Sequence, residues 1–215
     1  MKLETVNIGK PTDIQWKTKE VDTGIFKLPT EDPVKVHKLG LEGDHIADLS
    51  VHGGAYKAVY GYAVEHYAKW SERFPDVEFG PGKVGENLSI SGGLFEDAIH
   101  VGDKFRIGDV ELMAVEPRQP CYKFGAKIGD PMAIVAMREM GLSGVYFKVL
   151  KEGTIKAGDA VENYDKKPEN ITIREMADLL QGMTSDPALF QKAIDTPEIS
   201  DRKRDWFSKM LDKKS

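Results

Sequence analysis

The chain has 215 residues, a formal net charge of −5, 40% hydrophobic residues and 30% charged residues, which is typical of a soluble globular protein. This charge argues against a general nucleic-acid-binding protein, which would carry a basic excess, but it leaves room for a local positive pocket. The single cysteine excludes an intramolecular disulfide and is compatible with a reducing compartment. Neither a signal peptide nor an apolar run of membrane-spanning length is present, so we expect a cytoplasmic protein without a nucleic-acid or membrane partner.

Short alternating apolar segments, separated by glycine and proline, predict a chain rich in β-strands. The expected strands are Leu3 to Ile8, Gln15 to Thr18, Val34 to Leu39, Asn87 to Ile90, Phe105 to Ile107, Val110 to Val115, Val145 to Leu150 and Ala160 to Tyr164. Many short strands of this kind favour a closed barrel or a sandwich.

Two helices are expected to interrupt these strands. The first runs from about Ala55 to Arg73, where apolar residues recur at helical spacing. The second runs from about Pro131 to Met140, with proline at the first helical position and Gly141 as its stop. The methionines of this second segment are interpreted as core residues rather than as metal ligands.

A boundary is expected near residues 165–170, which are polar and contain a proline. Beyond it, Thr172 to Glu175 form a capping box, Asp186 with Pro187 starts a second helix, and Ser200 starts a third. We therefore expect a first domain over residues 1–165 and a three-helix extension over residues 166–215. The extension is too small to bury much surface alone, so it should pack on the first domain or on a partner.

The only cysteine, Cys121, follows the predicted strand Val110 to Val115 on a loop that two prolines stiffen. Arg118 and Lys123 flank the thiol, and positive neighbours favour the thiolate. The alternative is that Cys121 is a small buried hydrophobic residue, which is the commoner fate of a free cysteine.

A second candidate segment is His52-Gly53-Gly54, at the expected start of the first helix. Glycines there would let an anion approach free backbone N–H groups, and the helix dipole would favour it. Lys57 lies in the first helical turn, where the positive end of the helix dipole repels its charge. An anion bound between the lysine and the helix start would remove this repulsion. The alternative for Lys57 is an ordinary solvated lysine.

The segment Gly85-Glu86-Asn87-Leu88 offers further polar groups for a ligand. Residues 80–85 match the dinucleotide pattern G-x-G-x-x-G, but no βαβ unit surrounds them, so we reject that interpretation. The nearby set of Asp44, His45, Asp48 and His52 matches no common zinc spacing. Cys121 paired with His52 is also a possible nucleophile of a hydrolase.

Together these segments resemble the MOSC domain family (molybdenum cofactor sulfurase C-terminal domain), in its YiiM-like branch. The resemblance rests on Gly43-Asp44 with Asp48, on residues 51–58 and 66–70, on residues 85–88 and 102–105, and on Pro117 to Lys123. It covers about residues 1–164, and the three C-terminal helices look like the extension that YiiM-like proteins carry.

This resemblance implies a mainly β fold, a closed pyruvate-kinase-like β-barrel, that binds the molybdenum cofactor with Cys121 as thiolate ligand to molybdenum. It also implies reduction of N-hydroxylated compounds, such as 6-N-hydroxylaminopurine, to amines. A soft thiolate suits molybdenum, and positive groups suit the phosphate of the pterin. The residues expected to bind the cofactor are His52, Gly53, Gly54, Lys57, Glu86, Asn87, Arg118 and Lys123, and His52 or Asp48 is a candidate proton donor.

Electrons must come from a separate donor protein, because no flavin or iron–sulfur motif is present and one cysteine cannot hold a cluster. Two other functions stay open. The chain could be a carrier that binds the cofactor, or sulfur on Cys121, without turnover, or it could be a cysteine hydrolase that uses Cys121 and a histidine.

Overall fold

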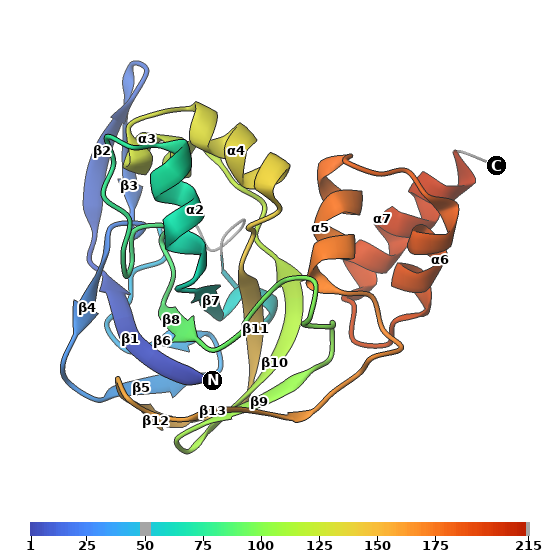
Figure 1. The fold of residues 1–215 in the computed structure, drawn as a ribbon, viewed down its shortest axis with the longest axis horizontal. Coiled ribbons are helices and arrows are strands. Elements are labelled where there is room, and N and C mark those ends of the chain that lie inside the picture. The colour runs from blue at the N-terminus through green and yellow to red at the C-terminus, as the bar shows by residue number, and fades with distance from the viewer. Residues whose placement is uncertain (48–52, 214–215) are drawn as a thin grey trace.

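The computed structural model describes residues 1–47 and 53–213, and its central element is an eight-stranded sheet (Figure 1). The strands of this sheet follow the order β13-β9-β10-β11-β7-β8-β1-β4. Their bounds are β1 Lys2–Gly9, β4 Lys27–Thr30, β7 Val59–Ala63, β8 Leu88–Ser91, β9 Lys104–Ile107, β10 Val110–Pro117, β11 Val145–Lys151 and β13 Val161–Asp165.

Two small sheets accompany the large one. One joins β12 (Gly153–Ile155), β5 (Val34–His37) and β6 (Gly40–Leu41), and the other is the hairpin of β2 (Thr12–Trp16) and β3 (Lys19–Thr23). The helices are the short 3₁₀ turn η1 (Ala55–Lys57), α2 (His66–Arg73), α3 (Tyr122–Ile128), α4 (Met132–Met140), α5 (Ile173–Gln181), α6 (Pro187–Asp195) and α7 (Asp201–Asp212). No helix among the described residues is long and apolar enough to cross a membrane.

The closed barrel expected from the sequence is wrong. Strands dominate, but the large sheet has two free ends, β13 and β4, and no ladder joins them within the described residues. Near β13, the start of the chain is joined to residues 158–161 by one isolated bridge, between Lys2 and Ala160, and by backbone hydrogen bonds of Met1 and Leu3, which do not extend into a ladder. Gly158, in the turn before β13, has a φ of +93°, which a side chain would strain.

The helix expected from Ala55 to Arg73 is also wrong. Only Ala55–Lys57 and His66–Arg73 are helical, and Val59–Ala63 between them is strand β7, buried at all five positions. This strand pairs with β11 on one side and, in parallel, with β8 on the other. A strand buried on both faces gives a continuous apolar run, which periodicity alone cannot distinguish from a buried helix segment.

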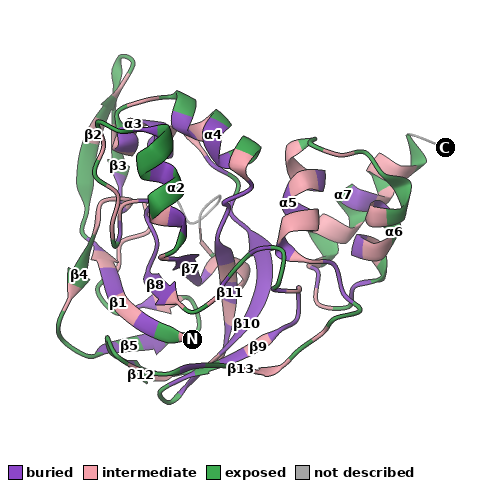
Figure 2. Cartoon of the chain, viewed as in Figure 1, coloured by how far each residue is buried: buried purple, intermediate pink, exposed green. Residues whose placement is uncertain are grey.

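The three C-terminal helices form a layer beside β10, on one side of the sheet (Figure 1), and α5 packs against that strand. One continuous hydrophobic core joins the two parts, because Ile173 and Met176 of α5 and Phe207 of α7 belong to the same cluster as sheet residues such as Phe105 and Leu112. Figure 2 shows these inward faces as buried and the outer helix faces as exposed. The domain boundary after residue 165 stays a prediction.

Candidate functional site

A single open cavity, with about 710 Å³ of empty volume including its mouth, brings together residues from six distant parts of the chain. Cofactors and small ligands usually bind in concave sites where a few polar groups converge. The lining residues with polar, charged or sulfur groups are Thr23, Lys27, Asp44, His45, Lys57, Tyr60, Asn87, Arg118, Gln119, Cys121, Lys123 and Tyr146. Of the residues expected to bind the cofactor, Lys57, Asn87, Arg118, Cys121 and Lys123 therefore share one cavity.

Cys121 lies at the start of α3, a helix that the sequence pattern did not predict. Its backbone is extended (φ −122°, ψ 171°), and its carbonyl accepts a hydrogen bond from the N–H of Phe124 at 2.9 Å. Pro120, directly before it, disfavours helical backbone at Gln119, so the helix cannot begin earlier. The cysteine is half-buried, not enclosed in the core, so its thiol is accessible at the cavity wall.

Arg118 forms the buried floor of the cavity. Its guanidinium donates to the carbonyl of Val84 and lies 5.1 Å from the ring centroids of both Tyr60 and Phe124. Burial opposes the charge of Arg118, but Tyr60, Tyr146 and Cys121 favour it, and its pKa is raised overall. Arg118 is therefore a fixed positive charge, held in a narrow slot between aromatic rings.

Three lysines add to this charge. Lys27 pairs with Asp44, and only 9% of its side chain is exposed. Lys57 lies 4.0 Å from the buried carboxylate of Glu116, and Lys123 donates to the carbonyl of Asp22 at 2.8 Å. Burial lowers the pKa of both Lys27 and Lys57. An anionic ligand in the cavity would be stabilised by these groups and would in turn favour the charged forms of Lys27 and Lys57.

The cavity carries four cationic side chains and one carboxylate, Asp44, although the whole chain has a net charge of −5. Asp44 pairs with Lys27 and also accepts hydrogen bonds from the N–H of Gly9 at 2.7 Å and from the amide of Asn87 at 2.9 Å. It balances one of the four cations, so the net charge of the side chains that line the cavity is positive.

His45 lines the same cavity. Its Nε2 lies 2.6 Å from Oδ2 of Asp22, and its backbone N–H donates to the carbonyl of Gly9 at 2.8 Å. A Cβ at Gly24 would lie only 1.8 Å from the carbonyl oxygen of His45, so this backbone is packed too closely for any residue but glycine. Close backbone packing thus holds His45 at the cavity, and a carboxylate orients its imidazole.

Glu86, expected to bind the cofactor, does not line the cavity. Its Oε1 accepts hydrogen bonds from the hydroxyl of Tyr67, from the N–H of Gly82 at 2.7 Å and from the hydroxyl of Ser89 at 3.2 Å. Its Oε2 is buried and has no hydrogen-bond partner within the described residues, and burial raises the pKa of this carboxyl. Burial also lowers the pKa of the neighbouring Lys127 to about 7.

Asn87, the next residue, lines the cavity but also stabilises the fold. Its side-chain oxygen accepts from the N–H of Tyr60 at 3.1 Å, while its amide donates to Asp44. It therefore fixes the positions of two neighbouring wall residues.

The glycine segment before η1 contributes less than expected. Gly53 and Gly54 are not among the residues that line the cavity, and η1 is a single three-residue turn, too short to give a helix dipole. His52 and Asp48 lie outside the described residues. Within residues 1–47 and 53–213, no group of three or more histidine, cysteine, aspartate or glutamate side chains could hold a metal ion.

Lys27, Tyr60 and Tyr146 were not predicted as cavity residues from the sequence, and His45 was considered only as a metal ligand. Lys27 lies in β4, and its neighbours in the sequence do not distinguish it from an ordinary surface lysine. Tyr60 and Tyr146 are directly opposite each other in the β7–β11 ladder, with ring centroids 5.0 Å apart. Only the correct pairing of β7 with β11 would have predicted that these two tyrosines lie together.

These residues fit the molybdenum cofactor that the sequence resemblance implies. The cofactor is an anionic phosphorylated pterin, and four cationic side chains face the space that it would occupy. The accessible thiol of Cys121, on the same wall, supplies the soft sulfur that such a metal prefers.

Comparison with known proteins agrees with this picture. The family model of the MOSC domain matches residues 48–162. The crystal structure of YiiM from Geobacillus stearothermophilus superposes with a TM-score of 0.81 and 30% sequence identity, covering 98% of each chain. The protein YflK of Bacillus subtilis (strain 168) is 35% identical over 170 residues, which are 79% of this chain and 76% of YflK.

One further relative carries an activity in its name. A protein of Gibberella moniliformis (strain M3125 / FGSC 7600), named "Reductase", is 34% identical over 145 residues. The match covers 66% of this chain but 26% of that longer protein.

Proposed function

The chain belongs to the MOSC domain family, in its YiiM-like branch, and on that premise we propose that it is a molybdenum-cofactor-dependent reductase of N-hydroxylated compounds. The family is associated with molybdenum cofactor binding, and one relative is named a reductase. The substrate class, with 6-N-hydroxylaminopurine as the example, and the role of Cys121 as metal ligand are the finer parts of this proposal.

The observation that carries the proposal is the position of an accessible thiol, Cys121, on the wall of a cavity with Lys27, Lys57, Arg118 and Lys123. A structural cysteine would be enclosed by apolar groups, and a cation cluster without a ligand would repel itself. Both features are explained at once by an anionic cofactor that takes its metal ligand from Cys121.

The four cations would hold the cofactor's phosphate and pterin oxygens, with Arg118 as a preorganised donor that aromatic rings keep in place. When bound, the cofactor would supply the two electrons that break the N–O bond of the substrate. The overall change also consumes two protons and releases the amine and water. A separate protein would deliver the electrons.

We assign the delivery of one of these protons to His45. His45 lines the same cavity as Cys121, and the carboxylate of Asp22, 2.6 Å from its Nε2, orients the ring. His52 and Asp48, the donors considered from the sequence, lie outside the described residues.

The test is metal analysis of protein expressed in a host that makes the cofactor, combined with reduction of 6-N-hydroxylaminopurine by an artificial electron donor. Wild type should retain molybdenum and turn over, whereas Cys121→Ala should lose both. A wild-type protein without molybdenum, together with unchanged reductase activity in Cys121→Ala, contradicts the proposal.

The same assay separates the carrier and the hydrolase. Molybdenum retention without any turnover of N-hydroxylated substrates supports a carrier. Activity that depends on Cys121 but persists without molybdenum supports a hydrolase, for which His45 rather than His52 is the described histidine in the cavity.

A further inference from the structure

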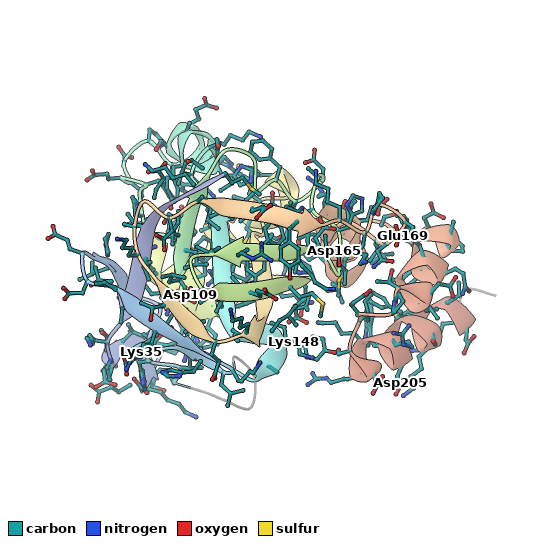
Figure 3. All side chains as sticks on the ribbon, turned by 90° about the horizontal axis from the view of Figure 1, so that it is seen from below. Lys35, Asp109, Lys148, Asp165, Glu169 and Asp205 are labelled. Carbon is teal, nitrogen blue, oxygen red and sulfur yellow. The ribbon has the colours of Figure 1, made fainter. Side chains whose placement is uncertain are left out.

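A buried carboxylate, Glu116, joins the Cys121 cavity to the C-terminal helices. Its Oε1 lies 4.0 Å from Nζ of Lys57 on the cavity wall, and its Oε2 lies 3.1 Å from Nζ of Lys203 on α7. Only 3% of the Glu116 side chain is exposed. Figure 3 labels Asp205 of the same helix, in the C-terminal layer beside the sheet. One carboxylate therefore bridges two ammonium groups that lie far apart in the sequence.

The position of Glu116 follows from an irregularity in β10. The pairing of β10 with β11 shifts its register between Ala114 and Glu116, and Glu116 then lies opposite Tyr146, a cavity residue. Irregularities of this kind redirect side chains, often next to functional sites. Glu116 itself is not among the residues that line the cavity, so its carboxylate is buried behind the wall rather than presented to a ligand.

Lys203 reaches Glu116 from the first turn of α7, whose N-cap is Ser200. The helix dipole repels a cation in this turn, so the stability of the helix alone does not explain a lysine there. The contact with Glu116 does explain it, because a buried carboxylate needs a close counter-charge. At 3.1 Å, Lys203 is the nearer of the two ammonium groups.

The charges of these three groups do not cancel. Two ammonium groups against one carboxylate leave one positive charge in excess, and it lies on the cavity side because Lys203 is the nearer partner of Glu116. The pKa of Lys57 is sensitive to both neighbours: burial has the largest effect and lowers it, Glu116 raises it, and Lys203 lowers it. Without Lys203, the whole charge of Glu116 would act on Lys57 and on any anion beside it.

We propose that Lys203 compensates the charge of Glu116 and thereby allows Lys57 to bind an anion in the Cys121 cavity. The inference rests on the proposed function, in which the cavity cations hold a phosphate. It gives the C-terminal helices a part in that site, because α7 supplies the counter-charge that the carboxylate would otherwise take from Lys57. Lys203 acts through Glu116 and is a positioning residue, since it does not line the cavity.

Docking of the helices alone does not account for this arrangement. The C-terminal helices already share a hydrophobic core with the sheet, through Ile173, Met176 and Phe207. A buried ion pair generally stabilises a fold no more than apolar side chains of similar size. A pair that served only to dock α7 would also not need Lys57 at the same carboxylate.

The test uses Cys121, the only cysteine of the chain, as a reporter of its own cavity. Full-length protein from a host that does not make the cofactor is alkylated with iodoacetamide at fixed pH and ionic strength, with inorganic phosphate as the anion. The phosphate concentration that halves the alkylation rate measures binding beside Lys57. Lys203→Gln should raise this concentration about tenfold, because an uncompensated buried charge next to an anion has an effect of that order.

Glu116→Gln distinguishes action through Glu116 from direct attraction between Lys203 and phosphate. This variant should bind phosphate at least as tightly as wild type, because the opposing charge is gone. Adding Lys203→Gln to it should then change the half-protecting concentration by less than about twofold. Lys203→Arg should bind phosphate as wild type does, since it keeps the charge. Lys209→Gln is the matched control, because it removes an exposed lysine from the same helix, and it should have no effect.

Three results overturn the inference: no phosphate protection in wild type, unchanged protection in Lys203→Gln, or an equal loss from Lys203→Gln in the wild-type and Glu116→Gln backgrounds. Weaker phosphate binding in Glu116→Gln overturns it as well. This last variant keeps the test decisive if Lys203→Gln does not fold, because its carboxamide leaves no buried negative charge to compensate. Urea denaturation of each variant shows whether the fold is retained.

The two proposals fail separately. A protein that retains molybdenum and reduces 6-N-hydroxylaminopurine, but in which Lys203→Gln leaves phosphate protection unchanged, overturns the role of Lys203 alone. Phosphate protection that depends on Lys203 through Glu116, in a protein that never retains molybdenum, supports the role of Lys203 and contradicts the reductase.

Discussion

Two neighbouring loops, the one that carries Cys121 and the one that carries Glu86, use their polar groups in opposite ways. Around Cys121 the charged groups face an open cavity, with Arg118 and Lys123 on its wall. Around Glu86 the polar groups face inward, and the hydrogen bonds to its Oε1 come from the backbone of Gly82 and from two nearby side chains. The charged groups of the first loop line the cavity, although Arg118 and Lys123 each also donate to a backbone carbonyl, whereas the polar groups of the second loop only hold the cavity wall in shape.

This difference has an energetic consequence. Charged groups at a cavity contribute little to folding and can repel one another until a ligand binds, so their loss should reduce function more than stability. Buried hydrogen-bonded groups behave in the opposite way, because removing one partner leaves the others desolvated and unsatisfied. Mutations in the two loops should therefore separate activity from stability.

The largest effect is expected at Cys121. Cys121→Ala should abolish molybdenum retention and reductase turnover, while the unfolding midpoint in urea changes little, because the thiol is half-buried and outside the apolar core. Metal analysis and urea denaturation of the same preparations measure both quantities. A large loss of stability in Cys121→Ala would show that Cys121 stabilises the fold, as Glu86 does, and would contradict its assignment to ligand binding.

The next effect is expected at Glu86, in stability. Glu86→Ala leaves Tyr67, the N–H of Gly82 and Ser89 without their acceptor and should cost about 2–4 kcal/mol in the free energy of unfolding. Glu86→Gln is the matched control, because its side-chain oxygen can accept the same hydrogen bonds. It should cost less than Glu86→Ala, because only its new amide N–H₂ group, at the place of Oε2, lacks a hydrogen-bond partner among the described residues. Equal losses in the two variants would contradict the hydrogen-bonding role.

His45 gives a smaller effect, confined to catalysis. His45→Gln should lower kcat about 100-fold without loss of molybdenum, because a positioned general acid typically contributes a factor of that order. Asp22→Asn should lower kcat less, since its carboxylate, 2.6 Å from Nε2 of His45, orients the ring. An unchanged kcat in His45→Gln at every pH would exclude this proton donor.

The smallest effect is a pH dependence of stability caused by Lys127. Burial lowers the pKa of this lysine from its ordinary value of 10.5 to about 7, so the unfolded chain binds more protons than the native chain between these values. The contribution of Lys127 to stability should therefore rise with pH across this window. Lys127→Gln should flatten the rise in unfolding midpoint between about pH 7 and 10, and parallel curves for the two proteins would contradict it.

The sequence predicted much of this arrangement where local signals are strong. The capping box at Thr172 and the Asp186-Pro187 start of α6 are both present in the structure. The stop of α4 at Gly141 is also observed, with φ of +67°. These features depend on hydrogen bonds and backbone angles within a few residues, so sequence alone determines them.

Features that depend on distant partners were missed. Residues 59–63 form a strand because β8 and β11 cover both edges, and no local pattern reveals that pairing. The entry of Lys27 and His45 into the cavity follows from the path of the chain through β4 and from the close packing at Gly24. The inward orientation of Glu86 likewise depends on Tyr67, which lies on a separate helix.

The most direct test of the central claim, that Cys121 binds molybdenum in this cavity, is X-ray absorption at the molybdenum edge of wild type and Cys121→Ser. We predict that the serine variant either loses the metal or loses one sulfur neighbour of the metal relative to wild type. Retention of molybdenum with an unchanged number of sulfur neighbours in Cys121→Ser would contradict the claim.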